Sequence, residues 1–206
     1  MALSKAYSLY QRRSFNLMTL GTVLRLNSEL EENNNMKMNY CPLCGTEAIQ
    51  KEIGDEGLMP FCPTCQMPLW DYFNTSIICA VVNEFDEIAL LRQDYVSTTN
   101  YVCVAGHMKS GESAEETAAR EIEEELGLKV NELIYIRSYP YEKKNLLMLG
   151  FLAKVNKDLF KLSGEVDAAE WVPLADARQK LREGGIAWQL TCTIIDNKTI
   201  YGLYTR

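Results

Sequence analysis

The chain has 206 residues, which is room for one medium-sized domain with a full core and a small second module. Its net charge of −7 at pH 7 disfavours non-specific binding to nucleic acid, because the phosphate backbone attracts clustered Lys and Arg. No apolar run reaches the ~20 residues that span a bilayer, so we expect no membrane segment. Seven cysteines without a recognisable secretory signal favour a cytoplasmic location and metal ligation rather than disulfides.

Residues 1–35 carry few signals of a packed fold. Up to Asn27 there are four basic residues and no acid, which is typical of transit peptides, but no apolar core with a cleavage site follows. A polar stretch rich in Glu and Asn comes next. We expect residues 1–35 to be a weakly ordered or dispensable extension, with a targeting segment or a docking helix as the alternatives.

A four-cysteine zinc ribbon is predicted over residues 36–70. The ligands form two C-x-x-C pairs separated by 17 residues: Cys41 and Cys44, then Cys62 and Cys65. All four positions around the ion would come from the protein, so we expect a structural zinc that supplies folding energy to a stretch too short for its own core. A pair of redox dithiols is the disfavoured alternative. Lys51 is the only basic residue between the two pairs, which favours a module that braces a neighbouring domain over one that binds nucleic acid.

Residues 73–206 read as a second domain with strands and helices. Strands are expected at 76–82, 87–93, 101–105, 132–138, 146–155 and 170–173, and helices at 114–126, 176–182 and 186–195. Strands interrupted by one helix and followed by others indicate a mixed sheet with helices on its faces, an α/β fold. Cys79, Cys103 and Cys192 lie within apolar runs and are expected to be core residues.

The helix after residue 113 has clear ends and an apolar face. Ser113 and Glu116 form a capping box at its start, and Gly127 is suited to end it in the left-handed conformation. One apolar residue recurs at every fourth position: Ala114, Ala118, Ile122 and Leu126. We therefore expect this helix to pack against the sheet.

Glutamates crowd the C-terminal half of the same helix. Glu121, Glu124 and Glu125 lie where the helix dipole is negative, and Glu121 and Glu125 are a like-charge pair four residues apart. A bound cation would offset this cost, and ligation by carboxylates alone favours Mg²⁺ or Mn²⁺. The alternative is a solvated acidic face, which does not require glycines or other acids at fixed places around it.

A glycine and a further glutamate do occur at fixed distances before this helix, and a glycine follows it. Gly106 is followed after five residues by Glu112, and after seven more by Arg120-Glu121-Ile122-x-Glu124-Glu125-x-Gly127-Leu128. This spacing resembles the Nudix box at every fixed position. The resemblance implies the α/β/α Nudix sandwich and an enzyme that hydrolyses a nucleoside diphosphate linked to another moiety, with Mg²⁺ or Mn²⁺.

The resemblance also implies roles for the acidic residues. Glu121, Glu124 and Glu125 would hold the metal. Glu165 resembles the additional acid that several Nudix enzymes place opposite the box helix, as a ligand or a base; a surface turn glutamate is the alternative. Either Glu124 or Glu165 would accept the proton from water. Arg120 lies one helical turn from other acids and is expected to orient Glu116 and Glu124.

Contacts with the substrate are expected from the loop around the start of the box. Gly106 and Gly111 would let the backbone approach the phosphates without a side chain in the way. His107, the single histidine, is a candidate substrate contact, and a solvent-facing histidine is the alternative.

A zinc ribbon before a Nudix domain resembles the NADH pyrophosphatase branch over about residues 40–200. Ser138-x-Pro140 and the segment 147–151 are similar to that branch's S-Q-P-W-P-F-P-x-S-L-M-x-G-F signature, with Tyr141 at the tryptophan and in the expected substrate pocket. Residues 142–146 depart from it, and Lys143 and Lys144 would suit a more highly charged phosphate substrate.

The branch implies hydrolysis of NAD(H) to AMP and nicotinamide mononucleotide. It also implies NAD-capped RNA as a further substrate, and a homodimer is an additional expectation. The first alternative is an ADP-ribose or nucleoside-diphosphate-sugar pyrophosphatase with the same metals and another pocket. An alternative of another class is a nucleotide-sensing binding module or regulator.

Overall fold

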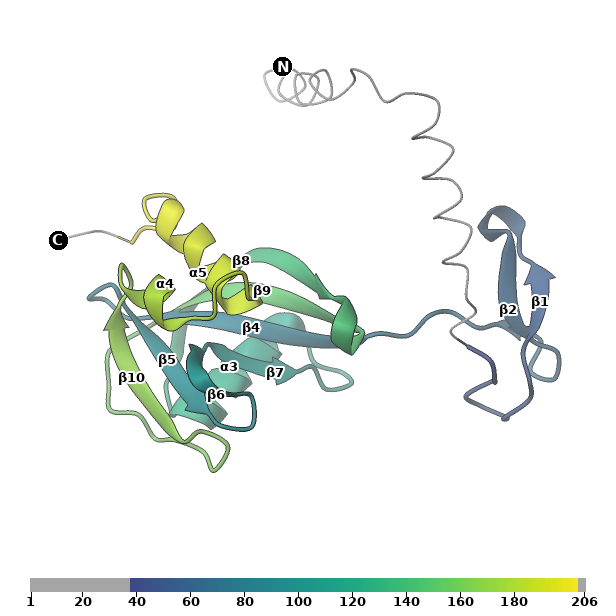
Figure 1. Cartoon of the computed structure of the whole chain (residues 1–206), viewed down its shortest axis with the longest axis horizontal. Coiled ribbons are helices and arrows are strands. Elements are labelled where there is room, and N and C mark those ends of the chain that lie inside the picture. Colours follow the sequence, from purple (N-terminus) through teal and green to yellow (C-terminus); the bar gives the residue numbers. More distant parts are fainter. Residues whose placement is uncertain (1–37, 204–206) are drawn as a thin grey trace, which may run out of the picture. The chain divides into compact units, whose positions relative to one another are not determined.

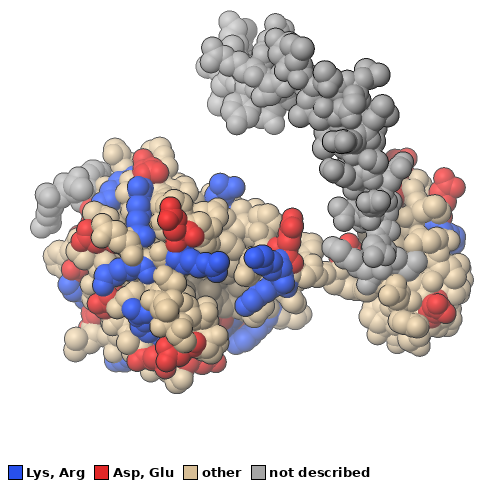
Figure 2. All heavy atoms as spheres, in the orientation of Figure 1, with Lys and Arg blue, Asp and Glu red and all other residues tan. Residues whose placement is uncertain are grey.

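A computed structural model describes residues 38–203, which fall into two compact units divided between Tyr72 and Phe73 (Figure 1). The expected N-terminal extension, residues 1–35, lies outside the described residues. Among those that are described, no helix is long and apolar enough to cross a membrane. On the face shown in Figure 2, Lys and Arg alternate with Asp and Glu and form no continuous basic surface.

The first unit is a small antiparallel sheet. Its strands are β1 (Ile49–Glu52), β2 (Leu58–Cys62) and β3 (Met67–Pro68), in the order β1-β2-β3, with the 3₁₀ turn η1 (Gly54–Glu56) between the first two. Its buried apolar cluster consists of Cys41, Cys62 and Leu69. Two of these three core residues are cysteines of the C-x-x-C pairs, so the centre of this unit is a thiol cluster rather than an aliphatic core.

The second unit is built on a seven-stranded sheet with the order β10-β5-β4-β9-β8, in which β6 also pairs with β5 and β7 with β4. The strands are β4 (Asn74–Val82), β5 (Glu87–Gln93), β6 (Ser97–Val102), β7 (Val104–His107), β8 (Val130–Tyr141), β9 (Leu146–Val155) and β10 (Ala168–Pro173). β4 and β9 are parallel and the other pairs antiparallel, so the sheet is mixed. The 3₁₀ turn η2 (Glu142–Lys144) joins β8 to β9.

Helices cover both faces of this sheet. α3 (Ala114–Leu126) packs on one face, where Ile77 and Phe151 share a core with its buried residues. α5 (Ile186–Asp196) and the short α4 (Ala177–Lys180) pack on the other face. A strand buried on both faces needs apolar residues at successive positions, which explains the run from Ile77 to Val82. The α/β/α sandwich with a mixed sheet is confirmed.

Several expected elements have different bounds: β4 and β10 each begin two residues earlier than predicted, and three other elements differ more. The strand predicted at 101–105 is two strands, because at Cys103 the chain changes from pairing with β5 to pairing with β4. The strand predicted at 132–138 is the longer β8. The helix predicted at 176–182 is only α4, since Leu181 is extended and forms a bridge with Tyr101. Cys79 and Cys103 are buried, as predicted, and Cys192 is half-buried.

Candidate active site

The helix that carries the Nudix-box glutamates, α3, is called the box helix below. It begins and ends where the sequence predicts. The Glu116 N–H donates to Ser113 Oγ over 3.2 Å, and Glu116 Oε2 accepts from the Ser113 N–H over 2.8 Å. Gly127 has a φ of 68° and donates its N–H to the Glu123 carbonyl over 2.9 Å. Because both ends are fixed, the glutamates between them occupy defined positions on α3.

Arg120 holds three acids of the box. Its guanidinium donates to Glu112 twice, over 2.8 and 3.0 Å, to Glu121 Oε1 over 2.8 Å, and to Glu124 Oε2 over 2.9 Å. The paired guanidinium lowers the pKa of Glu112 to about 2. Arg120 was also expected to orient Glu116, but that carboxylate instead accepts from the Ser113 N–H in the capping box. Arg120 therefore orients the box glutamates.

Glu125 is the buried member of the cluster. It is 4% exposed, and its Oε1 accepts from Gln93 Nε2 over 2.9 Å, whereas Oε2 is buried and has no hydrogen-bond partner in the described part of the chain. Burial raises its pKa to about 7; the charges of Glu121, Glu165 and Glu124 act in the same direction, and the hydrogen bond from Gln93 opposes them. An orphaned carboxylate oxygen beside other carboxylates is a position that a cation would satisfy.

The donor set fits a hard divalent cation. When ionised, Glu112, Glu121, Glu124 and Glu125 carry four negative charges. The positive charges beside them are Arg120 and the more distant Lys109, whose Nζ lies 4.0 Å from Glu124 Oε1. Every candidate ligand is a carboxylate oxygen, the ligand type that Mg²⁺ and Mn²⁺ prefer. The side chain of Glu121 is 14% exposed and that of Glu124 is 53% exposed, so the cluster extends from the core to the surface.

Gly106 makes room for a ligand of this cluster. It lies in β7, and a Cβ at this position would come within 2.0 Å of Glu121 Cδ. A glycine here therefore lets Glu121 lie against the strand, which differs from the expected clearance for substrate phosphates. Gly111 has a φ of 91° and open space around its Cβ position, so its backbone conformation is what requires glycine.

Glu165 lies close to the buried glutamate. The segment that follows β9 runs along the end of α3, where the Lys161 N–H donates to the Leu126 carbonyl over 2.9 Å and the Ser163 N–H donates to the Glu125 carbonyl over 3.4 Å. The charge of Glu165 is among those that raise the pKa of Glu125. The loop thus brings an exposed acid near the end of the box helix, and the role of Glu165 as a ligand or base stays a prediction.

His107 contacts Arg120 of the box through its backbone carbonyl. Its carbonyl accepts from Arg120 over 3.3 Å, and its side chain is exposed. The next residue, Met108, donates its N–H to the Thr75 carbonyl over 3.1 Å, which continues the β7–β4 pairing into the box loop. The imidazole therefore lies at the end of the sheet, near the box.

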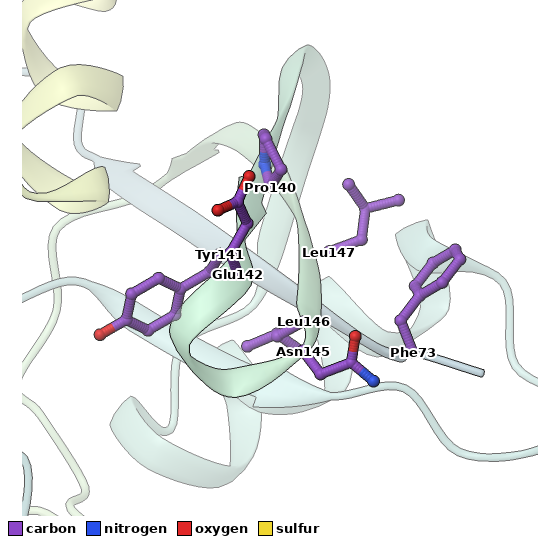
Figure 3. A pocket seen from close by; sticks show the side chains of 7 residues that line it. All are labelled: Phe73, Pro140, Tyr141, Glu142, Asn145, Leu146 and Leu147. Carbon is purple, nitrogen blue, oxygen red and sulfur yellow. The ribbon is translucent and has the colours of Figure 1, made fainter. Parts of the chain in front are cut away.

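Tyr141 lines a hollow of about 230 Å³ at the same end of the sheet (Figure 3). Most of the lining is apolar or aromatic, and the residues are Phe73, Pro140, Tyr141, Glu142, Asn145, Leu146 and Leu147. Leu147 pairs with Thr75, the residue whose carbonyl holds the box loop. Adjacent strands lie ~5 Å apart, so the hollow is within about two strand spacings of the box loop.

The four cysteines of the first unit form a cluster suited to zinc. Their Sγ atoms all lie within 4.8 Å of one another, with Cys41 to Cys65 at 3.9 Å and Cys44 to Cys62 at 3.5 Å. Thiolates around a tetrahedral zinc with Zn–S bonds of ~2.3 Å are separated by ~3.8 Å. The Cys65 N–H also donates to Cys62 Sγ over 3.2 Å, which holds the second pair in shape.

Sequence reasoning missed the direct role of two residues. Glu112 was expected only as a fixed position of the box, yet it receives two hydrogen bonds from Arg120. Gln93 was not expected at the site at all. The available signal was weak: β5 ends in two polar residues, Arg92 and Gln93, after the apolar run from Ile88 to Leu91. Tyr95, at the following turn, has a raised pKa: partial desolvation is the main cause, and the charges of Glu125, Glu165 and Glu121 act in the same direction.

Comparison with known proteins gives the class. A family model described as "NUDIX domain" matches residues 73–192, more than half of the chain, and the chain therefore belongs to the Nudix family. The fold is similar to that of a Nudix hydrolase from Nitrosomonas europaea, with a TM-score of 0.59 and 18% identity over 79% of this chain and 93% of that one. It is also similar to the Nudix domain of Shewanella oneidensis NrtR, solved with ADP-ribose, with a TM-score of 0.55 and 13% identity over 67% and 94% of the chains.

The chain is also similar to curated NAD-capped RNA hydrolases. It is 30% identical to the NAD-capped RNA hydrolase NudC of Photobacterium profundum, over 72% of this chain and 55% of the relative. It is 32% identical to the NAD-capped RNA hydrolase NudC of Pseudomonas aeruginosa, over 66% of this chain and 48% of the relative. The chain thus spans about half the length of these curated relatives.

Proposed function

We propose that this protein is a Nudix pyrophosphohydrolase that cleaves NAD(H) to AMP and nicotinamide mononucleotide. The observation that carries the proposal is the carboxylate cluster on α3, in which the buried Oε2 of Glu125 has no hydrogen-bond partner among the described residues. Burying a carboxylate oxygen without a partner costs free energy, and a domain that binds no metal would have nothing to compensate that cost.

The residues of the box have different proposed roles, as metal ligands or as groups that orient them. Glu121, Glu124 and Glu125 would hold Mg²⁺ or Mn²⁺, with Glu165 as a further ligand. Such an ion, when bound, neutralises charge on the diphosphate and lowers the pKa of a bound water. Arg120 keeps Glu121 and Glu124 oriented through the hydrogen bonds described above.

Hydrolysis needs a proton acceptor beside the diphosphate. The water oxygen forms a new P–O bond as a P–O bond to the bridging oxygen breaks, and the water proton passes to Glu124 or to Glu165. Both side chains are exposed and therefore open to a substrate. At saturating metal, the Glu124→Gln and Glu165→Gln variants separate the two roles, because only the loss of the acceptor removes the acidic limb of the pH–rate profile.

Preference for NAD(H) has separate support. The curated relatives are named as NAD-capped RNA hydrolases, and the hollow beside Tyr141 lies within reach of a dinucleotide whose diphosphate is at the box. The net charge of −7 and the mixed charges visible in Figure 2 favour the small dinucleotide over a long RNA body. NAD-capped RNA is therefore proposed as a secondary substrate.

One observation favours the runner-up, an ADP-ribose or nucleoside-diphosphate-sugar pyrophosphatase. Lys143 and Lys144 are exposed on η2, at the edge of the hollow, where the branch signature has no counterpart to them. Two ammonium groups at this edge would attract an additional phosphate or a more polar moiety. A regulator that only binds nucleotide is the third candidate and would bind without turnover.

The test is a comparison of NADH, NAD⁺, ADP-ribose and ADP-glucose with the full chain and Mg²⁺ or Mn²⁺, with release of AMP as the readout. We expect NADH to be cleaved with the highest kcat/KM. Equal or faster cleavage of ADP-ribose would move the assignment to the runner-up. Tight binding of any of the four without AMP release would favour the regulator.

The first unit is proposed to hold a structural Zn²⁺ through Cys41, Cys44, Cys62 and Cys65. All four ligands would come from the protein, which leaves no position open for chemistry. Zinc ligation needs reduced thiols, and this supports a cytoplasmic location. A homodimer remains part of the proposal, to be tested by the mass of the protein in solution.

A further inference from the structure

The strand beside the box helix ends in a buried amide. Gln93 is the last residue of β5 and is 5% exposed. Ala89 and Leu91, on the same face of the strand, lie in the core under α3. A buried amide costs free energy unless it is hydrogen-bonded. Gln93 Nε2 meets this need by donating to Glu125 Oε1 over 2.9 Å, and the two residues are 32 positions apart in the sequence.

The backbone of Gln93 is fixed at the same point. Its carbonyl accepts from the Val96 N–H over 2.8 Å, closing the turn between β5 and β6, and Gln93 pairs with Ser97 across that turn. The amide therefore extends from an anchored position. When one oxygen of a carboxylate is held by a fixed donor, the direction of the other oxygen is fixed as well.

We propose that Gln93 is a positioning residue for the divalent-cation site: its amide holds Oε1 of Glu125 so that the buried Oε2 is presented to the cation. The inference rests on the proposed function, because it takes the box glutamates as the ligands. A neutral donor suits this place, since it orients the carboxylate without adding a charge that would compete with the cation. Removing a residue that hydrogen-bonds to a metal ligand typically lowers metal affinity by about 10–100-fold.

The test measures Mn²⁺ affinity of the full chain by electron paramagnetic resonance of free Mn²⁺. Gln93→Met keeps the approximate volume of the side chain and removes the donor. We expect Mn²⁺ to bind about tenfold more weakly, or weaker still, with activity recovering at high Mn²⁺. Leu91→Met is the matched control, because it introduces the same side chain on the same strand in the same core; it should bind Mn²⁺ like the wild type.

A double-mutant cycle separates positioning from a general structural effect. In the Glu125→Gln background, Gln93→Met should change Mn²⁺ affinity less than twofold, because the oriented carboxylate is already absent. An equal loss in both backgrounds would overturn the proposal. If the methionine variant does not fold, as judged by its Tm, Gln93→Asn replaces it; its amide is one methylene too short to reach Oε1, and the same weakening is expected.

Other results also decide the matter. Mn²⁺ affinity of folded Gln93→Met within twofold of the wild type would overturn the role of Gln93 and leave the metal site intact. A wild-type chain that binds no Mn²⁺ would instead overturn the proposed function, and the positioning role with it.

Discussion

The thiol cluster of residues 38–72 and the carboxylate cluster on α3 gather their ligand atoms by different means. Cys41 and Cys62 are themselves core residues of a unit whose buried apolar cluster has one further member, Leu69. The carboxylates instead lie on a helix that is capped at both ends and packed on a large sheet. We infer that the first cluster needs its ion in order to fold, whereas the second is held in place before an ion arrives.

The two clusters also differ in how they are completed. The four thiols would supply all positions of a tetrahedral ion, which would leave none for a substrate. On α3, Arg120 and Gln93 occupy some carboxylate oxygens, while Oε2 of Glu125 lacks a partner and the side chain of Glu124 is 53% exposed. A closed site suits stability and an open one suits chemistry.

Removal of zinc should unfold residues 38–72 and leave residues 73–203 folded. Structural zinc contributes on the order of 10 kcal/mol to the folding of small modules, more than this core can replace. Amide NMR spectra before and after chelation would show the loss of dispersed signals from the first unit alone. Retention of those signals without zinc would contradict the contrast. Cys79→Ala, which alters a cysteine outside the cluster, is the control for zinc content.

Glu124→Gln should reduce kcat/KM for NADH by more than a hundredfold, a loss of over about 2.7 kcal/mol in transition-state stabilisation. The amide lacks the negative charge needed by a metal ligand or a base. Glu123→Gln, at the adjacent exposed position of α3, is the matched control and should be fully active. Unchanged activity of the Glu124 variant would remove the box from the mechanism.

The stability of the metal-free chain should fall as pH rises from about 4.5 to about 7. Burial raises the pKa of Glu125 to about 7 from the ordinary 4.5, so the native state binds more protons than the unfolded state within this window. The free energy of unfolding should decrease by about 3 kcal/mol across it. Urea unfolding at pH 5 and pH 8 measures this, and Glu125→Gln should lack that part of the decrease. Identical pH dependence in both proteins would refute the assignment to Glu125.

Gly106→Ala should lower kcat/KM about tenfold and change Tm little, a cost of about 1.4 kcal/mol. The new Cβ would overlap the Glu121 side chain, which can move aside but then leaves its place in the cluster. Gly164→Ala adds the same methyl group in open space and serves as the control. Full activity of the Gly106 variant would show that the position of Glu121 against β7 is not required.

Local patterns predicted the helix of the site well. Ser113, Glu116 and Gly127 define the ends of α3 through contacts within a few residues, so the sequence contains the whole signal. The mixed sheet between helices also followed from apolar runs. The split at Cys103 did not, because residues 101–105 form one continuous strand-like run, and only the change of partner from β5 to β4 divides it.

Long-range contacts were the part of the site that spacing could not give. The hydrogen bond between Gln93 and Glu125 joins β5 to α3, and nothing near either residue indicates the other. Gly106 was expected to clear space for phosphates, but its Cβ position is next to Glu121, 15 residues later in the sequence. Motif spacing thus identified which residues matter and left open what each of them touches.

The most direct test of the account is AMP release from NADH by the full chain with and without added Mg²⁺, after removal of loosely bound metal. We predict rapid release with Mg²⁺ and a rate at least a hundredfold lower without it, while the zinc content stays at one per chain. Equal rates under both conditions, or no AMP in the presence of bound Mg²⁺, would contradict the claim that the open carboxylate cluster is the catalytic site.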